Sequence, residues 1–224
     1  MAGLPAHAQT SAVPQVSAVG VGELRVAPDY ALAVFAVETS SPDAARAGRE
    51  NAARMASLRQ GVEKQGIPPA AISTVGYSVR NEARVPGRAP KGEPDWFVAR
   101  NAIRVEVAPL EQLGALIDVA LASGANRVDS IAFLAKEERE WRRKALALAV
   151  EHARAQAEAM AGAAGGKLGE LLELSAGDAP SIPRPLFAER AAAAGTVVEP
   201  AELVIAERVV ARWRFAPPGS ATPR

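Results

Sequence analysis

Alternation of apolar and polar positions marks the first two strands of the chain. Residues 16–26 alternate small and apolar side chains and predict a strand. A tight turn follows at Ala27-Pro28-Asp29, because proline presets φ and aspartate favours turns. Residues 30–39 predict a second strand with apolar residues on both faces, which indicates a central strand covered on both sides.

A spacing of three and four residues then replaces the alternation and predicts a helix that ends at about Lys64. We expect Ser41 to cap its N-terminus, with Pro42 at the first helical position. At the other end, Gly66 takes the left-handed conformation and Pro68 prevents continuation. The predicted inward stripe is Gly48, Ala52, Met55, Leu58 and Val62.

Two strands are predicted in the middle of the chain, over residues 72–81 and 96–107. In the second of them, apolar residues alternate with arginine and glutamate, so that one face meets water. The segment between them, 82–95, is rich in proline, glycine and arginine and predicts a long hairpin loop. The apolar side chains that share one face of the first strand are Val75, Tyr77 and Val79.

Two more helices follow, a short one over residues 110–123 that ends at Gly124 and a long alanine-rich one over 136–164. Residues 127–134 between them predict a strand. Because the long helix offers mainly alanine, we expect it to lie close to a sheet. Its predicted inward stripe is Leu146, Val150, Ala153, Ala157, Met160 and Ala164.

The last two strands are predicted over residues 168–175 and 202–215, separated by a proline- and alanine-rich segment, 177–200, without a sustained period. The apolar face of the final strand holds Leu203, Ile205, Val209, Ala211, Trp213 and Phe215, and the opposite face holds Arg208, Arg212 and Arg214.

This order of elements predicts an α+β fold with about seven strands in mostly antiparallel sheets and three helices. We expect a single domain over residues 9–216, as one body or as two sub-lobes, and a tail at 217–224. The loops 82–95 and 177–200 are expected to be mobile.

Composition excludes several classes of function. The net charge of the 224 residues is +1, so no strong field attracts nucleic acid or an anionic membrane. Aromatic residues make up 4%, too few for a platform that stacks bases. The absence of cysteine removes disulfides, thiolate metal sites and cysteine nucleophiles. No run approaches the ~20 apolar residues of a transmembrane helix.

An export signal is suggested by Ala6-His7-Ala8, which has the small-residue pattern of a signal-peptidase site. The apolar region that precedes such a site is missing. We interpret residues 1–8 as the end of a secretory signal; the alternative is a short leader that contains the pattern because the chain is rich in alanine.

Candidate catalytic groups are few and scattered. The two histidines are His7, in the presumed leader, and His152, in the long helix, where no partner is placed to orient it as a general base. Carboxylates in or near turns could work in pairs, but Asp29 is better explained by its turn, and Asp129 by a solvent face or a strand-end hydrogen bond. The candidates are Asp29, Asp95, Asp129 and Asp178. We therefore predict no catalytic residue, no cofactor and no metal site.

A nucleotide site is also disfavoured, because Gly20-Val21-Gly22 lacks the third glycine and the following helix of a dinucleotide fingerprint. Glycines that serve a twisted or bulged strand explain the pattern better. A mildly basic loop admits an anionic lipid partner, through Arg80, Arg84, Arg88 and Lys91. Tryptophans are enriched at interfaces, and Trp96 and Trp141 are candidates for exposure, which motivates an oligomer hypothesis.

The stretch from Gly124 to Gly169 resembles the SIMPL-domain proteins of bacteria. The resemblance rests on the Gly124-Ala125-Asn126 turn and the long alanine-rich helix, supported by the Gly20-Val21-Gly22-Glu23 strand. It implies an exported envelope or periplasmic protein that self-associates, is linked to stress tolerance and has no agreed enzyme activity.

Three functions follow in order of preference. The first is a non-enzymatic homo-oligomer with a structural or protective role in the envelope. The second is a module that binds an envelope protein or lipid through the loops 82–95 and 177–200. The third is a hydrolase that uses carboxylates converging in one cleft.

Overall fold

The computed structural model describes residues 13–82, 96–178 and 200–218. These residues form two compact units, each with its own sheet. The predicted leader and most of the predicted tail and of both long loops lie outside the described residues. So do the following candidate residues: His7, Arg84, Arg88, Lys91 and Asp95.

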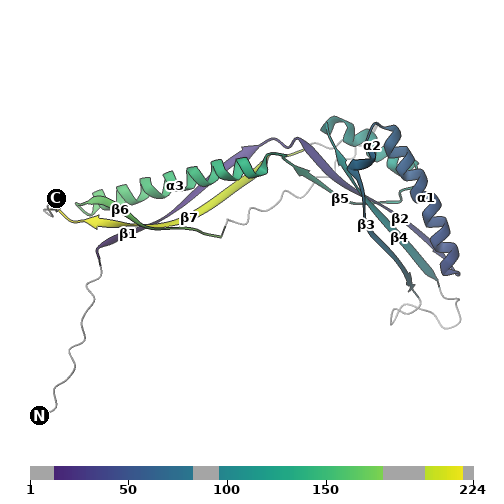
Figure 1. Cartoon of the computed structure of the whole chain (residues 1–224), viewed down its shortest axis with the longest axis horizontal. Coiled ribbons are helices and arrows are strands. Elements are labelled where there is room, and N and C mark those ends of the chain that lie inside the picture. The colour runs from purple at the N-terminus through teal and green to yellow at the C-terminus, as the bar shows by residue number, and fades with distance from the viewer. Residues whose placement is uncertain (1–12, 83–95, 179–199, 219–224) are drawn as a thin grey trace, which may run out of the picture. The chain divides into compact units, whose positions relative to one another are not determined.

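The four-stranded unit is an antiparallel sheet with two helices on one face (Figure 1). Its strand order is β3-β4-β2-β5, and all three neighbouring pairs are antiparallel. The predicted strands and helices are confirmed, with the short turns η1 and η3 added. The elements are β2 (Tyr30–Ser41), α1 (Ala44–Lys64), η1 (Pro69–Ala71), β3 (Ile72–Asn81), β4 (Phe97–Val107), η3 (Leu110–Gln112), α2 (Leu113–Ala122) and β5 (Arg127–Leu134).

The core of this unit lies between the sheet and the two helices. Phe35 of β2 and Ile103 of β4 are fully buried there against Leu58 of α1. The prediction that β2 is central is confirmed, because it lies between β4 and β5. Its covering is unequal, however: the residues facing the helices are buried, whereas Leu32 and Val34 on the other face are half-buried.

The prediction that Ser41 caps α1 is wrong, because the N-cap is Asp43. Oδ1 of Asp43 accepts a hydrogen bond from the backbone N–H of Arg46 at 2.6 Å. Ser41 still belongs to β2 and supports the turn, since its hydroxyl accepts from the N–H of Asp43 at 3.2 Å. The helix end is as predicted, with Gly66 at a φ of 85°.

The inward stripe of α1 also differs in its first half, where Ala47 and Asn51 are buried in place of Gly48 and Ala52. Asn51 is fully buried and its Nδ2 donates to the carbonyl oxygens of Val37, at 2.8 Å, and Ala99, at 3.0 Å. A buried polar side chain on this stripe therefore ties α1 to the two central strands.

The three-stranded unit joins β1, β7 and β6 in that order, with β6 and β7 antiparallel. The long helix α3 runs along β1 (Figure 1). Trp213 of β7 is buried in its core, as predicted. The elements are β1 (Gln15–Val26), α3 (Glu138–Ala163), β6 (Lys167–Ala176) and β7 (Leu203–Ala216).

The predicted stripe of α3 is only partly right, because the fully buried residues are alanines spaced by four. They are Ala145, Ala149, Ala153, Ala157 and Ala161. Leu146 and Met160, predicted to face inward, are 39% and 44% exposed. Larger side chains do not fit where the helix lies against β1.

Two glycines of β1, Gly20 and Gly22, explain this close approach. A Cβ added at Gly20 would lie 1.8 Å from the carbonyl oxygen of Ala149. One added at Gly22 would lie 2.0 Å from that of Ala145. The backbones of β1 and α3 are therefore in direct contact, glycine against alanine.

Candidate functional site

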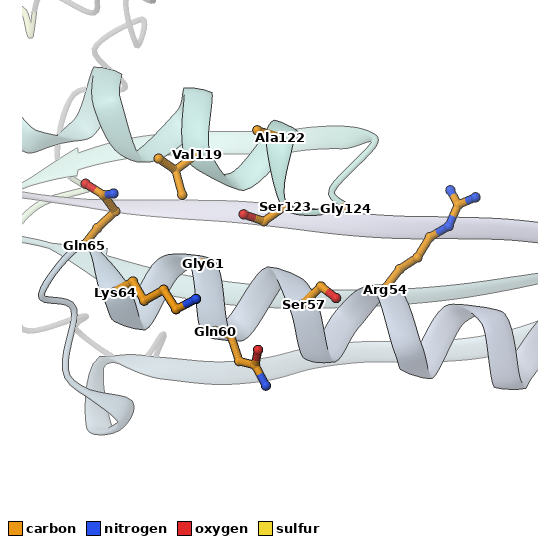
Figure 2. Close-up of a pocket in the computed structure, with 10 residues that line it drawn as sticks. All are labelled: Arg54, Ser57, Gln60, Gly61, Lys64, Gln65, Val119, Ala122, Ser123 and Gly124. Carbon is orange, nitrogen blue, oxygen red and sulfur yellow. The ribbon is translucent and has the colours of Figure 1, made fainter.

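A cavity of about 540 Å³ lies between α1 and α2 (Figure 2). Its floor is the helix contact at Gly61, where an added Cβ would lie 2.2 Å from Oγ of Ser123. Of the residues that the structure describes, Arg54 and Lys64 bring charged side chains to its lining. The lining residues are Arg54, Ser57, Gln60, Gly61, Lys64, Gln65, Val119, Ala122, Ser123 and Gly124.

Polar and basic side chains dominate the described lining of this cavity, which suits a polar molecule. General acid–base catalysis needs a group that titrates near the working pH and a second group that orients it. Among the described residues, no carboxylate or histidine lines the cavity. Arg54, Ser57 and Lys64 are exposed, so the cavity is also open to water, which weakens electrostatic interactions inside it.

His152 occupies a structural position on α3. Its Nδ1 lies 3.2 Å from the backbone N and 3.1 Å from the backbone O of Val21, and Nε2 lies 3.0 Å from Nε2 of Gln156. Depending on the ring tautomer, Nδ1 accepts from the N–H or donates to the C=O of Val21. The side chain thus binds the backbone of β1, as expected of a packing histidine.

Two of the candidate carboxylates, Asp29 and Asp129, do not form a pair. Asp29 accepts hydrogen bonds from the N–H of Lys136, at 3.1 and 3.2 Å, beside the end of β5 at Leu134. Asp129 lies near the opposite end of β5, next to Arg127. Two carboxylates that work on one bond need to flank it at about 5–10 Å with room for substrate between them. Asp29 and Asp129 instead hold separate ends of a strand.

Asp129 belongs to a four-residue ion network on the sheet. Arg100 contacts both Asp129 and Glu38, the latter at 3.3 Å from Nε to Oε1. Arg127 contacts the same two carboxylates, at 3.2 Å and 3.5 Å. The hydrogen bond to Asp129, with the charge of Glu38, raises the pKa of Arg127. Two cations and two anions therefore neutralise one another across β2, β4 and β5.

The basic face of β7 is neutralised within the chain. Arg212 contacts Glu173 at 2.6 Å, and Arg214 contacts Glu170 at 2.7 Å. Both glutamates lie on β6. Arg212 and Arg214 thus have acidic partners within their own sheet. Exposed pairs of this kind contribute little stability, typically below about 1 kcal/mol.

The part of the chain that the structure describes contains neither a candidate metal site nor a candidate membrane-spanning helix. No group of three or more histidine, aspartate and glutamate side chains there is placed to hold a metal ion. None of the helices in residues 13–82, 96–178 and 200–218 has the length and apolarity of a membrane span.

The outermost strands carry large apolar side chains in water. On β6, Leu171, Leu172 and Leu174 are exposed, with Leu171 at 51%. On β3 the exposed apolar residues are Val75, Tyr77 and Val79, with Tyr77 at 61%. The sequence pattern placed the β3 residues on one face but gave no sign that they meet water, because an outer strand and a central strand can have the same pattern.

Comparison with known proteins gives relatives without an assigned activity. The uncharacterized protein YggE of Edwardsiella ictaluri is 28% identical over 170 residues, which cover 75% of this chain and 71% of that protein. The 26 kDa periplasmic immunogenic protein of Brucella melitensis is 25% identical over 190 residues, or 82% of this chain and 76% of that protein. A match of 25% over the same length relates the chain to the Brucella abortus protein of that name.

The family comparison agrees with the resemblance drawn from the Gly124–Gly169 stretch. The model that matches describes a protein of unknown function (DUF541) and covers residues 16–213, from β1 to Trp213 of β7. Both compact units lie within that span. Since the match covers far more than half of the chain, the protein belongs to the SIMPL family.

Proposed function

We propose that this protein is an exported, non-enzymatic component of the bacterial envelope that acts by self-assembly. The observation that carries the proposal is the exposure of large apolar side chains on the outer strands β3 and β6. Exposed apolar surface that gathers on particular elements is a mark of protein interfaces. Sheet edges are moreover able to accept a further strand.

The chemistry of the described residues favours binding over catalysis. The cavity between α1 and α2 has no acid–base pair, His152 is occupied with β1, and Asp29 and Asp129 serve opposite ends of β5. A structural or stress-protective role needs surfaces rather than a reactive centre. That role is therefore the one we propose.

Export is supported by the relatives from Brucella, which are described as periplasmic. It is consistent with the cysteine-free composition, which is compatible with an oxidising compartment. Fractionation of cells that express the full-length gene tests this part of the proposal. We expect the protein in the periplasmic fraction, and recovery in the cytoplasmic fraction alone would contradict it.

Size exclusion coupled to light scattering on the full chain tests self-assembly. We expect a discrete mass that is a multiple of the monomer mass and that is kept over a tenfold range of concentration. A monomer at every concentration would refute the proposed function. The apolar residues of β3 and β6 would then require another partner.

A further inference from the structure

The two sheets have four edge strands, β1, β3, β5 and β6, and these edges are protected to different degrees. An edge strand carries unpaired N–H and C=O groups that accept another strand. Natural proteins block such edges with charges, bulges or covering side chains. A comparison of the four edges therefore indicates which one is left open for a partner.

The edge strand β1 is occupied by a side chain of its own unit. Nδ1 of His152 lies within hydrogen-bond distance of both backbone polar atoms of Val21, in the second half of the strand. An incoming strand would have to displace this imidazole to pair with Val21. The edge at β1 is therefore closed at that position.

The strands β5 and β6 are protected by bulges and charge. The register of β5 with β2 shifts at Asp129, which is ion-paired with Arg100 and Arg127. The register of β6 with β7 shifts twice, and this strand carries Lys167, Glu170 and Glu173. Both features oppose the addition of a regular strand.

The edge strand β3 lacks these protections over most of its length. Residues 72–79 contain no charged side chain and no proline, and they include isoleucine, valine, threonine and tyrosine, which favour strands. The one bulge, at Val75, is followed by regular pairing with β4 from Gly76 to Asn81. In Figure 1, β3 forms the margin of the four-stranded sheet. Val79 and Tyr77 are exposed there.

We propose that β3 pairs in antiparallel fashion with β3 of a second copy of this chain. The inference rests on the proposed function, since it names the surface through which self-assembly occurs. Two identical strands suit each other here because residues 72–79 bring no like charges together. Cross-strand pairs of aromatic and β-branched residues stabilise antiparallel strands.

A second copy fits this edge better than an extended peptide of another protein. Recognition of a foreign peptide by strand addition obtains its specificity from pockets beside the edge. The cavity of Figure 2 lies between α1 and α2 and is not lined by any residue of β3. Backbone pairing and the side chains of β3 itself are then the source of selectivity.

The geometry of the pair follows from its symmetry. Two identical antiparallel strands are related by a dyad perpendicular to the sheet, so residues that face each other have the same parity. The two sheets then form one continuous sheet, with α1 of both copies on the same face. Tyr77 lies beside α1, where an added Cβ at Gly48 would be 3.5 Å from its hydroxyl.

The first test introduces a lysine on β3 and measures the mass of the assembly. Tyr77→Lys introduces a charge at an exposed side chain, so the fold is retained while pairing with a second copy is opposed. The matched control is Leu121→Lys, an exposed apolar residue of α2 that lies on no sheet edge. Light scattering is expected to give a smaller mass for Tyr77→Lys and the wild-type mass for Leu121→Lys.

A single cysteine tests the same contact without disturbing it. The chain has no cysteine, so Ser78→Cys on β3 and Ser130→Cys on β5, at the opposite margin of the same sheet, each provide one thiol. A short bis-maleimide is expected to join two copies of the Ser78→Cys protein and to leave the Ser130→Cys protein as single chains. The reaction needs no unfolding and works on the assembled protein.

The outcomes separate this inference from the proposed function. If the wild-type chain is a monomer, both fail. If it assembles but Tyr77→Lys keeps the full mass and Ser78→Cys does not cross-link, self-assembly stands and pairing through β3 is wrong. Loss of assembly in both lysine variants would also overturn it, because the effect would then not depend on the edge.

Discussion

Gly20 and Gly22 determine how near α3 comes to β1. A Cβ at either position would meet the helix backbone at 1.8 or 2.0 Å, and a backbone cannot move aside as a flexible side chain can. The alanines on the facing stripe complete the contact from the other side. The identity of two single residues thus sets how closely a strand and a helix pack.

We predict that Gly20→Ala destabilises the protein by about 3 kcal/mol or more, the upper end of the cost of overpacking. The matched control is Gly162→Ala in α3, where an added Cβ meets nothing within 4 Å. That change should raise stability by about 0.5–1 kcal/mol, because alanine restricts the unfolded chain. Urea unfolding of both variants provides the measurement, and equal stability would contradict the packing argument.

Asn51 leads to a prediction about charge in the core. Asn51→Asp removes the amide donor to Val37 and Ala99 and places a carboxyl group in a fully buried position. Burial raises the pKa of that carboxyl above its unfolded value of about 3.9. The cost is therefore smaller in acid, where both states are protonated and the single O–H can replace only one of the two hydrogen bonds, and it grows as the pH rises through that value.

At pH 7 we expect Asn51→Asp to cost on the order of 3–5 kcal/mol, which corresponds to a shift of a few pKa units. The control is Gln60→Glu, the same exchange of amide for carboxylate on the exposed face of α1, with an expected change below about 0.5 kcal/mol. Denaturation at pH 4 and pH 7 distinguishes them. A pH-independent loss in the Asn51 variant would refute burial as the cause.

At the scale of elements, the start of α1 depends on one side chain. Asp43→Ala removes the acceptor for the N–H of Arg46 and should cost about 1 kcal/mol. Asp43→Asn keeps an acceptor at the same place and should cost only a few tenths of about 1 kcal/mol, because asparagine caps a helix about as well as aspartate. Thermal unfolding followed by circular dichroism compares the two. Equal losses would mean that the charge, not the cap, matters.

The elements were predictable because their patterns are local. Alternation over residues 72–81 or the repeated alanines of α3 arise from neighbours in sequence, and both elements occur where the pattern predicted them. The helix ends at Gly66 and Gly124 were equally local, since each takes a positive φ that favours glycine. The antiparallel α+β arrangement followed from this order of elements.

What the sequence could not provide depends on partners far along the chain. The inward face of α3 was placed on Leu146 and Met160 because they are apolar, whereas the contact is set by glycines of β1 more than a hundred positions earlier. Asn51 was missed for the same reason, since its acceptors at Val37 and Ala99 lie on two strands. The cavity between α1 and α2 has no motif at all.

On the scale of the whole molecule, the two units have cores of different composition. Large side chains fill the four-stranded unit, among them Phe35, Leu58 and Ile103. The core of the three-stranded unit is mostly alanine around Trp213, with Val209 beside it. Because burial of apolar area stabilises roughly in proportion to its size, the alanine core is expected to be the weaker one.

We therefore predict that the three-stranded unit unfolds at a lower denaturant concentration than the four-stranded unit. Trp96→Phe with Trp141→Phe leaves Trp213 as the single tryptophan, buried in the alanine core. Its fluorescence should report an earlier transition than the far-ultraviolet circular dichroism, which follows both sheets.

The comparison is made on the Tyr77→Lys background at low protein concentration, so that assembly does not stabilise either unit by mass action. Two separate midpoints would establish the units as independent cooperative bodies within one family domain. A single coincident transition would mean that the two cores unfold together. Substitutions at Gly20 and at Asn51 would then lower the same free energy of unfolding, although the two residues lie in different units.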